Sequence, residues 1–423
     1  MKFIFSDSLD FVDPDFDFIE DRSSPSRRPY WDDAYPHELF ETPPYDGMLV
    51  SKAIVGDYRV KGQYTESQAM RFYRVGVREF LRLDKPKFST MPIFGDCGAF
   101  SYAQADIPPY SPEEIVDFYN SCNFTHGCSV DHIIFDYLDS CVGLDGASED
   151  ARRRFDITLE NANTFLKAHH AQQSTFVPLG VVQGWSPGSM AECARQLCAM
   201  GYTYIAIGGL VPLKAPQIHK IIQAVQNVVP QHTRIHLLGF AKADVIAEFV
   251  TYNITSFDTT SPLIRAFKDK QKNYYALNAS GVLSYFTALR VPQATGNSRL
   301  IRAAKEGKIN QEDMLALETR SLAALRAYDR GSASIDETLD AVITYNVFLE
   351  SSLHDNTIDR DKLATKLEPL YRNTLQAQQW KECECSICQQ IGIEVIIFRG
   401  SNRNRRRGMH NLFVYHNRIK QLR

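Results

Sequence analysis

The sequence predicts an α/β protein built on a (β/α)8 TIM barrel, with helical insertions and a small C-terminal subdomain. Apolar runs of four to seven residues alternate with amphipathic segments over residues 91–262, a pattern typical of strand–helix units around a parallel sheet. Polar residues or glycines follow directly after these runs, and in a barrel the carboxyl ends of the strands meet at one mouth. No GxGxxG follows the first strand, which argues against a Rossmann sheet.

The elements can be predicted in chain order. Residues 1–45 are rich in Asp, Pro and aromatic residues and predict an extended arm that packs on the body. A buried strand is expected at Tyr45–Val55 and a helix at Glu66–Arg82. The further strands expected are Met91–Phe94, His132–Phe135, Phe176–Val182, Tyr202–Ile207, Arg234–Leu238 and Ile254–Phe257. The helices expected between and after them are 111–122, 152–170, 186–201, 215–229 and 242–253.

Two of these helices carry end signals. Ser111 and Glu114 form a capping box at the start of one, and Gly201 is the expected C-terminal cap of another. Residues 296–375 are mostly helical in pattern and are expected to complete the outer layer of the barrel and add a helical insertion. The predicted division is therefore an arm over 1–45, a barrel over 46–375 and a subdomain over 376–423.

The composition is that of a globular protein, with 423 residues, 44% of them hydrophobic and 23% charged. No apolar run approaches the roughly 18–20 residues that span a bilayer. The N-terminus turns acidic after five residues, unlike a secretory signal. Nine cysteines, an odd number, favour a reduced, cytoplasmic protein over a disulfide framework.

A cysteine cluster is the most specific local motif. Cys383, Cys385 and Cys388 give CxCxxC, and either His410 or His416 could supply a fourth ligand. Three thiolates and one imidazole form a closed tetrahedral site, so the cluster predicts structural Zn²⁺; the alternative is a set of free surface thiols. The other cysteines are expected to be buried small hydrophobes: Cys97, Cys122, Cys128, Cys141, Cys193 and Cys198.

A basic run lies between the cysteines and His410. The formal net charge is −3, yet Arg403, Arg405, Arg406 and Arg407 fall close together. Such a run is usually a solvated loop, and the functional alternative is a patch that binds the phosphates of a nucleic acid.

Two carboxylates, Asp96 and Asp258, are expected at the barrel mouth. Such a pair permits covalent displacement at an acetal-like carbon, in which one carboxylate attacks and the other moves protons. The alternative for each is an ordinary hydrogen-bonded aspartate at the end of a strand.

A set of polar groups and one aromatic ring is expected beside them. Asp136, Gln183 and the backbone of Gly209 and Leu210 offer donors and acceptors in a plane, and Phe100 offers a stacking face. This combination suits a guanine-like ring. A purely structural role is an equal alternative for Gln183.

The order of these motifs resembles that of the tRNA-guanine transglycosylase superfamily. The blocks GDCGAF, IIFD, QG, GGL, LLGF, SFD, CxCxxC and HNL follow one another from about residue 45 to the C-terminus. Members of this family are zinc-containing (β/α)8 barrels that exchange a guanine in nucleic acid for a 7-deazaguanine. The resemblance therefore implies the same fold, metal and type of reaction.

The resemblance also implies roles for residues. Asp258 matches the nucleophile that attacks C1′ of the sugar, and Asp96 matches the general acid/base. Phe100 matches the residue that stacks on the base. The implied base-recognition positions are Asp136, Gln183, Gly209 and Leu210. The implied zinc ligands are Cys383, Cys385, Cys388 and His410, because HNL selects His410 over His416.

The sequence departs from the family pattern at several positions. The usual DSGGFQ is DCGAFS here, with Cys97, Ala99 and Ser101, and the usual QGS has Trp185 in third place. The block around Asp136 is loose, so that Asp139 could take its role.

The acidic arm FSDSLDFVDPDFDF and the phrase YDGMLVS resemble the DNA-modifying branch of the family. That branch inserts 7-cyano-7-deazaguanine (preQ0) into DNA. In bacteria and phages it belongs to a modification system with partner proteins that include an ATPase, so the resemblance implies a bacterial or phage-encoded protein. The alternatives are a tRNA-guanine transglycosylase of the queuosine or archaeosine type, and a catalytically silent zinc-containing partner that binds nucleic acid. The presence of both Asp96 and Asp258 argues against the silent partner.

Overall fold

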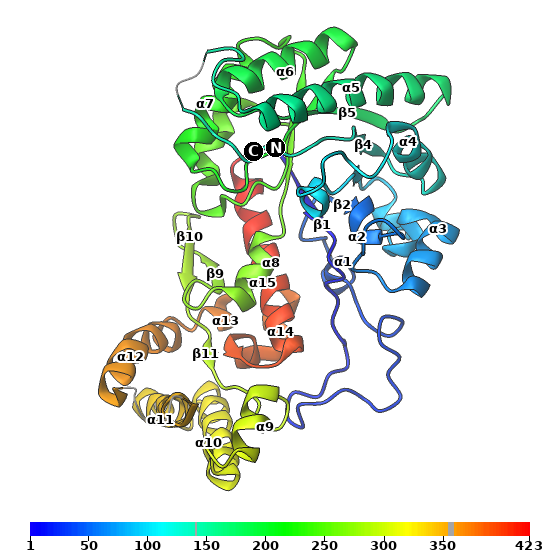
Figure 1. Cartoon of the computed structure of the whole chain (residues 1–423). Helices are drawn as coiled ribbons and strands as arrows, with labels where there is room; N and C mark the ends of the chain where they lie inside the picture. The colour runs from blue at the N-terminus through cyan, green and yellow to red at the C-terminus, as the bar shows by residue number, and fades with distance from the viewer. Residues whose placement is uncertain (140–141, 354–358) are drawn as a thin grey trace. The chain divides into compact units, whose positions relative to one another are not determined.

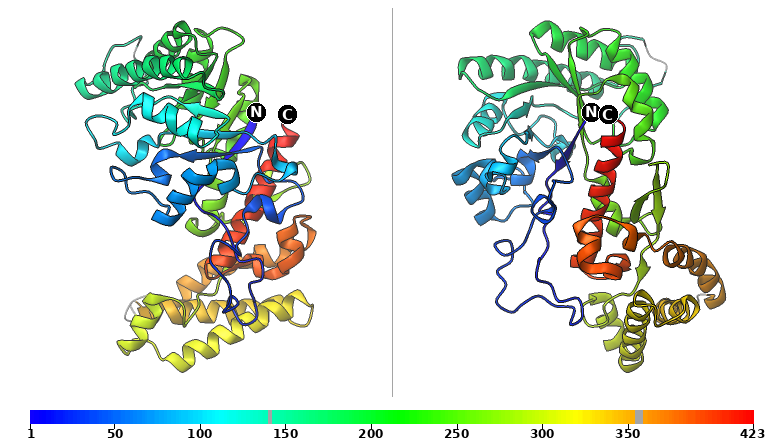
Figure 2. Two further views of the ribbon diagram at one scale, coloured as in Figure 1. Left: turned by 90° about the vertical axis from the view of Figure 1, so that its right-hand side faces the viewer. Right: turned by 180° about the vertical axis from the view of Figure 1, so that it is seen from behind.

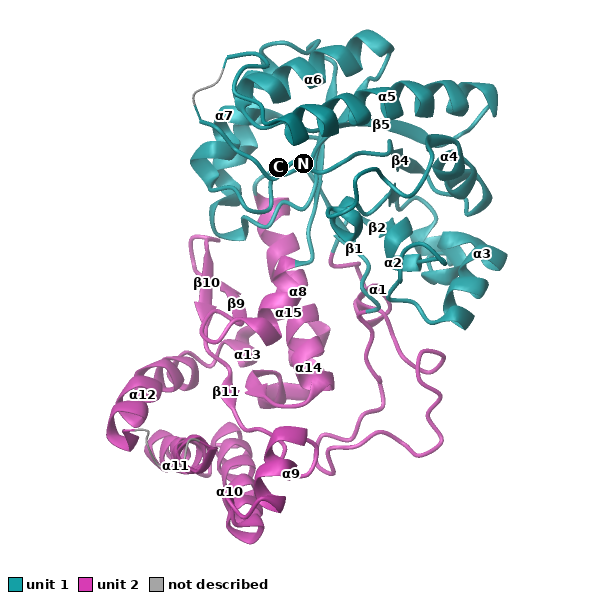
Figure 3. Ribbon diagram, viewed as in Figure 1, with its two compact units in different colours: residues 1–9, 45–260, 422–423 teal, residues 10–44, 261–421 magenta. Residues whose placement is uncertain are grey.

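The chain forms two compact units in a computed structural model that describes residues 1–139, 142–353 and 359–423 (Figure 3). Unit 1 comprises residues 1–9, 45–260 and 422–423. Unit 2 comprises residues 10–44 and 261–421. Cys141, one of the predicted buried cysteines, lies outside the described residues.

Unit 1 is a closed barrel of eight parallel strands that pair in chain order (Figures 1 and 2). The strands are β1 (Lys2–Ser6), β2 (Gly47–Ser51), β3 (Ile93–Asp96), β4 (His126–Cys128), β5 (Val177–Val182), β6 (Tyr204–Ile207), β7 (Arg234–Leu237) and β8 (Ser256–Asp258). Strand β1 pairs with both β2 and β8 and thereby closes the barrel. The predicted barrel is confirmed, but its first strand lies in the segment predicted to be an arm.

Helices follow most strands of the barrel and cover its outside. They are α2 (Lys52–Val55), α3 (Glu66–Phe80), α4 (Pro112–Ser121), α5 (Glu149–Ala171), α6 (Pro187–Met200) and α7 (Ala215–Gln226), with 3₁₀ segments η1 (Pro86–Phe88), η2 (Ala99–Tyr102) and η3 (Ala243–Tyr252). The predicted caps are confirmed: Ser111 Oγ accepts from the Glu114 amide, and Gly201 closes α6 with φ +111°.

Close approach of α4 to the barrel explains two glycines. A Cβ added at Gly95 would lie 2.2 Å from the ring of Tyr119, and one at Gly127 would lie 2.4 Å from it. The tyrosine therefore packs directly on the backbone of β3 and β4, and its hydroxyl donates to the Cys128 carbonyl at 3.1 Å.

The strand predicted at His132–Phe135 is wrong, because β4 ends earlier, at Cys128. Ile133 and Ile134 are buried as predicted, yet they lie in irregular chain. The His132 amide donates to Thr158 Oγ1 at 3.0 Å instead of joining a strand ladder. Burial without strand pairing explains why this apolar run resembles a strand in the sequence.

Unit 2 contains the helical region, the cysteine cluster and the C-terminal helix. Its elements are α1 (Pro36–Leu39), α8 (Ser261–Lys268), β9 (Tyr274–Leu277), β10 (Leu283–Phe286), β11 (Leu289–Arg290), α9 (Ser298–Lys305), α10 (Gln311–Asp329), α11 (Ile335–Leu353), α12 (Arg360–Ala377), α13 (Gln379–Glu382), α14 (Ser386–Ile391), η4 (Gly392–Ile396), β12 (Ile397–Phe398) and α15 (Ser401–Gln421). The helices α9–α12 belong to this unit and share its apolar core, so the predicted boundary at residue 375 does not separate compact units.

Within the described residues, none of the helices combines the length and apolar character that crossing a bilayer requires.

Candidate active site and metal-binding cluster

A cavity of about 170 Å³ lies at the carboxyl ends of the barrel strands. Its lining comes from the ends of all eight strands and the loops that follow them, which explains how residues far apart in sequence meet. The lining residues are Ser6, Leu49, Ser51, Asp96, Ala99, Phe100, Asp131, Ile133, Gln183, Gly208, Gly209, Leu238, Gly239 and Asp258. Asp96, Phe100, Gln183, Gly209 and Asp258 were predicted from the sequence to share such a site.

Asp258 is the last residue of β8, and its buried carboxylate accepts hydrogen bonds on both oxygens. Ser6 Oγ, at the end of β1, donates to Oδ2 at 2.7 Å. The amide of Gly239 donates to Oδ1 at 2.8 Å. These donors come from the strands on either side of β8 and hold the carboxylate in one orientation at the cavity wall.

His236, on β7, is hydrogen-bonded both to Asp258 and to a buried serine of the barrel interior. Its Nε2 lies 3.2 Å from Asp258 Oδ1, and its Nδ1 lies 2.6 Å from Ser256 Oγ. A carboxylate only accepts, so Nε2 carries a proton and donates to Asp258. Ser256 Oγ lies 2.6 Å from the hydroxyl of Tyr204, which completes a buried chain of hydrogen bonds behind the carboxylate.

Asp96 ends β3 on the same cavity. Ser51 Oγ donates to its Oδ2 at 3.1 Å, and the Gly98 amide donates to the same oxygen at 3.0 Å. Burial, followed by the nearby carboxylates of Asp131 and Asp258, raises the pKa of Asp96 to about 7. A carboxyl group with such a pKa can both accept and donate a proton at neutral pH.

Asp131 is a cavity residue that the sequence analysis missed. It lies three residues beyond β4 and is 3% exposed. Cys97 Sγ donates to its Oδ1 at 3.0 Å, and Gln183 Nε2 donates to its Oδ2 at 2.7 Å. The hydroxyl of Tyr102 donates to Cys97 Sγ at 2.8 Å. Burial raises the pKa of the Asp131 carboxyl.

Asp136 and Asp139, the two aspartates proposed from the sequence for this position, lie outside the cavity lining. Both are exposed. Asp136 accepts from Ser148 Oγ at 2.8 Å, at the N-cap of α5, and Asp139 pairs with Lys220 at 2.6 Å. The prediction of Asp136 as a residue of the ring pocket is therefore wrong, because β4 ends earlier than the apolar run suggests.

Gln183 and the segment after β6 form one wall of the cavity. Gln183 is buried, and a Cβ at Gly208 would lie 2.4 Å from its Nε2. Gly209 has φ +70°, so glycines allow the backbone to turn beside this side chain. Leu210 is buried and does not line the cavity.

Phe100 lies at the cavity opening, on η2. Its ring is 57% exposed, and the ring of Phe135 lies 6.0 Å away at an angle of 53°. A half-exposed ring at the edge of a polar cavity can stack on a planar ligand.

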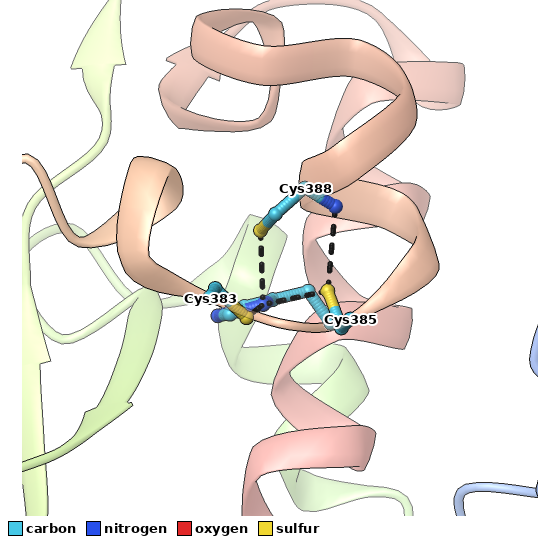
Figure 4. Close-up of side chains that lie close together, drawn as sticks. Cys383, Cys385 and Cys388 are labelled. Atoms are coloured by element: carbon cyan, nitrogen blue, oxygen red, sulfur yellow. Dashed lines mark hydrogen bonds between the residues drawn. The ribbon is translucent and has the colours of Figure 1, made fainter.

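The predicted metal ligands gather in unit 2 (Figure 4). The sulfurs of Cys383, Cys385 and Cys388 lie 3.5, 3.4 and 3.3 Å from His410 Nδ1. A tetrahedral metal with bonds of about 2.3 Å to sulfur and about 2.0 Å to nitrogen would separate these atoms by about 3.5 Å. His410 Nε2 lies 2.8 Å from the Tyr275 carbonyl and donates to it, which leaves Nδ1 free to bind a metal. The cluster therefore fits a metal, with His410 rather than His416 as its histidine.

Comparison with known proteins places this site in a family. The profile described as "Queuine tRNA-ribosyltransferase" matches residues 75–281. A Salmonella montevideo protein named "DNA-guanine transglycosylase" is 42% identical over 422 residues, covering 99% of this chain and 97% of that protein. The chain belongs to the tRNA-guanine transglycosylase superfamily. Two proteins named "Queuine tRNA-ribosyltransferase" match a smaller part of this transglycosylase. The one from Neisseria meningitidis serogroup C (strain 053442) is 27% identical over 30% of this chain and 34% of its own length. The one from Acinetobacter baumannii is 24% identical over 44% of this chain and 52% of its own length. The full-length similarity thus lies with the branch that the Salmonella protein represents.

The arginines predicted as a basic loop of this transglycosylase lie instead in the first turns of α15. Arg403, Arg406 and Arg407 are each no more than 1% exposed. The phosphate-binding role predicted for these three is therefore wrong, because their guanidinium groups are enclosed by unit 2. Arg405 is half-buried and donates to the Phe11 carbonyl at 2.9 Å.

Outside α15, Arg403 and Arg406 find their partners in the acidic N-terminal segment and in η4. Arg403 pairs with Asp21, and its Nε donates to Glu394 Oε2 at 2.7 Å. Arg406 donates to the Asp13 carbonyl at 2.9 Å. Residues 10–44 therefore supply acceptors for α15 within unit 2, which accounts for both the acidic start and the basic end of the sequence.

Proposed function

We propose that this protein is a DNA-guanine transglycosylase that exchanges guanine in DNA for preQ0 through a covalent aspartyl–sugar intermediate. One observation carries the proposal: Asp258 and Asp96 line a single cavity with Asp131 and Gln183. The first pair suits displacement at a sugar carbon, and the second suits recognition of a guanine edge. The full-length similarity to a protein named DNA-guanine transglycosylase supports DNA as the nucleic acid.

In the first step, a carboxylate oxygen of Asp258 forms a bond to C1′ of the target nucleotide. The C1′–N9 bond breaks, its electron pair goes to N9, and guanine leaves with the proton of the Asp96 carboxyl group, which is left as a carboxylate. The donors on Asp258 from Ser6, Gly239 and His236 fix the direction of attack, so little reorganisation is needed. The target base must be turned out of its stack to reach the cavity.

In the second step, the incoming 7-deazaguanine replaces the enzyme. Asp96 takes the N9 proton, N9 forms the new bond to C1′, and the C1′–oxygen bond to Asp258 breaks with its electron pair returning to the carboxylate. Two inversions retain the configuration at C1′. One N-glycosidic bond replaces another, so the exchange itself needs no ATP, and an ATPase partner in the bacterial cytoplasm would act on the DNA.

Asp131 is the proposed acceptor for the guanine edge, in place of Asp136. Each of its carboxylate oxygens keeps a free lone pair after bonding Cys97 or Gln183. Guanine presents two donors, N1–H and the 2-amino group, which match a carboxylate.

Replacing Asp131 by Asn should lower kcat/KM for exchange by on the order of 10²-fold, because an amide group places a donor against the donors of guanine. Asp136→Asn is the matched control and should change kcat/KM by less than about twofold, since Asp136 is exposed and lies outside the cavity lining. Steady-state assays with varied base concentration measure both. An equal loss in the two variants would contradict the assignment.

The pH dependence of base insertion tests Asp96. Its pKa of about 7 means that the deprotonated base form grows as pH rises and is complete above neutrality. Starting from the isolated covalent intermediate, the insertion rate should fall as pH falls through the pKa of Asp96, by about tenfold per pH unit below that pKa. Because Asp258 is a neutral ester in this intermediate, one of the charges that raise the pKa of Asp96 is gone, and the inflection should lie below 7. Asp96→Asn should remove this dependence along with most of the rate. The Ser51 hydroxyl donates to Asp96 and lowers the pKa of that carboxyl group, so in Ser51→Ala the inflection of the insertion rate should move to higher pH. A move to lower pH would contradict the assignment of Asp96.

The function is tested by incubating the purified protein with preQ0 and either guanine-containing DNA or tRNA, followed by mass spectrometry of the nucleosides. We expect deazaguanine deoxynucleosides and release of guanine from DNA. Exchange only in tRNA would show a queuosine-type enzyme, which the matching family profile makes the second candidate. Binding without exchange in either would show a catalytically silent partner.

We also propose that the Cys₃His cluster binds structural Zn²⁺. Three thiolates and one imidazole leave no position for a water ligand, so the metal would stabilise unit 2 and take no part in the exchange.

A further inference from the structure

Five of the large exposed apolar side chains of unit 1 lie in loops that follow the barrel strands. Phe100 and Ile107 follow β3, Phe135 and Leu138 follow β4, and Val211 follows β6; their exposed fractions lie between 40% and 66%. We call these five residues the apolar rim. Single exposed apolar residues are ordinary on a protein surface, but a group at one end of a barrel marks a contact surface.

The apolar rim stands on two sides of the cavity. Phe100 lines the cavity, and its ring contacts that of Phe135. On the other side, a Cβ added at Gly239 would lie 2.8 Å from Val211 Cγ2, and the Gly239 amide is the donor to Asp258. The nucleophile therefore lies between apolar side chains that face solvent.

The position of Asp258 fixes where the polynucleotide runs. The reacting C1′ must lie against this carboxylate with its base in the cavity, so the neighbouring nucleotides lie across the opening, over the apolar rim. When a base leaves a duplex it leaves a gap between its neighbours, and an inserted apolar side chain replaces the stacking that is lost.

We propose that Phe135, supported by Phe100, is the wedge that enters the DNA stack where the target guanine has turned out, while Val211 packs against the nucleotide on the other side. This rests on the proposed function, since it requires DNA as the substrate. The occupant of the apolar rim is then the pair of bases that flank the target guanine in duplex DNA.

The test compares exchange rates on a duplex with those on its target strand alone. In a single strand the target guanine has no base pair to break, so an inserted side chain should contribute less to the exchange rate there. For Phe135→Ala, we expect the ratio of duplex to single-strand rates to fall at least about tenfold, corresponding to about 1.4 kcal/mol of lost stabilisation. Phe135→Trp should keep the wild-type ratio. Val228→Ala is the control, because Val228 is 40% exposed but precedes β7 at the opposite end of the barrel.

A second measurement follows the DNA directly. With 2-aminopurine beside the target guanine, wild-type protein should raise the fluorescence as the stack opens, and Phe135→Ala should raise it at least about tenfold less at equal occupancy. An unchanged rate ratio in Phe135→Ala, or wild-type exchange restricted to single strands, overturns the wedge. Absence of exchange in every DNA by the wild type overturns the proposed function instead, so the two failures are distinguishable.

Discussion

Replacing Asp258 by Asn should abolish base exchange, with a loss on the order of 10⁴-fold in the rate of guanine release. A carboxamide is neutral and cannot form a stable ester with C1′, so the covalent intermediate does not accumulate. The effect should exceed that of any other single substitution in the cavity, because no other group considered in the mechanism forms a bond to the sugar.

The same substitution should leave the barrel folded. The amide oxygen can still accept from the Gly239 amide and from His236, and the amide nitrogen can donate to the rotatable hydroxyl of Ser6. Asp258→Ala would instead leave these three buried donors without their acceptor, which costs about 1–3 kcal/mol each. Asn is therefore the variant that separates chemistry from stability.

Single-turnover release of labelled guanine, and a denaturing gel that detects protein linked to DNA when no incoming base is supplied, measure the effect. The wild type should give a linked species and Asp258→Asn should give none. A linked species of equal yield in the variant would assign the nucleophile to another residue, and Asp96→Asn is the comparison to make next.

The barrel and much of the cavity could be predicted because their signals are local. A strand followed at once by Asp96, or by Asp258, places the carboxylate at the strand end whatever the rest of the chain does. The metal cluster was predictable for the same reason, since CxCxxC fixes three ligands within six residues.

Asp131 escaped prediction because the apolar run beside it is buried in irregular chain. Ile134 donates its amide to Gln183 Oε1 at 3.4 Å, a contact between segments that the sequence does not reveal. The short strand His126–Cys128 contains only one strongly apolar residue, so the apolar run His132–Phe135 was predicted as the strand in its place. His236 escaped for a related reason: its position within the pattern of β7 is that of a core residue, and only the register with β8 brings it to Asp258.

The burial of the arginines of α15 could not be predicted, because a charged residue in a sequence gives no sign of whether it is buried or exposed. Arg407 is fully buried and donates to the Val395 carbonyl at 3.2 Å, and burial lowers its pKa to about 9. Three of its acceptors are the backbone carbonyls of Val395, Ile397 and Ala266, which carry no sequence signal, and the other is Asn404 Oδ1. The ion pair of Arg403 with Asp21 joins residues at opposite ends of the chain, so neither end could be interpreted alone.

Loss of the metal should be the second large effect, acting on stability. Cys383 follows α13, Cys385 caps α14, Cys388 lies within α14, and His410 lies on α15, so one ion bound by all four would join three helices of unit 2. Structural Zn²⁺ contributes about 10–16 kcal/mol of apparent binding free energy in small zinc domains, and part of this supports folding. Cys385→Ser should abolish stoichiometric zinc and, at a cost of about 4 kcal/mol, lower the melting temperature by roughly 10 °C.

Zinc analysis, thermal unfolding with and without chelator, and cobalt substitution measure this effect. Cys198→Ser is the matched control: this thiol lies on α6 in unit 1, is only partly buried, and should change neither zinc content nor melting temperature. Cobalt in a Cys₃His site should show the strong absorption of tetrahedral thiolate ligation. Because the four ligands lie within unit 2 and the cavity carboxylates lie within unit 1, restored zinc should restore stability even in Asp258→Asn. If zinc were lost in Asp258→Asn and retained in Cys385→Ser, the metal would lie in the cavity, which would contradict its structural role.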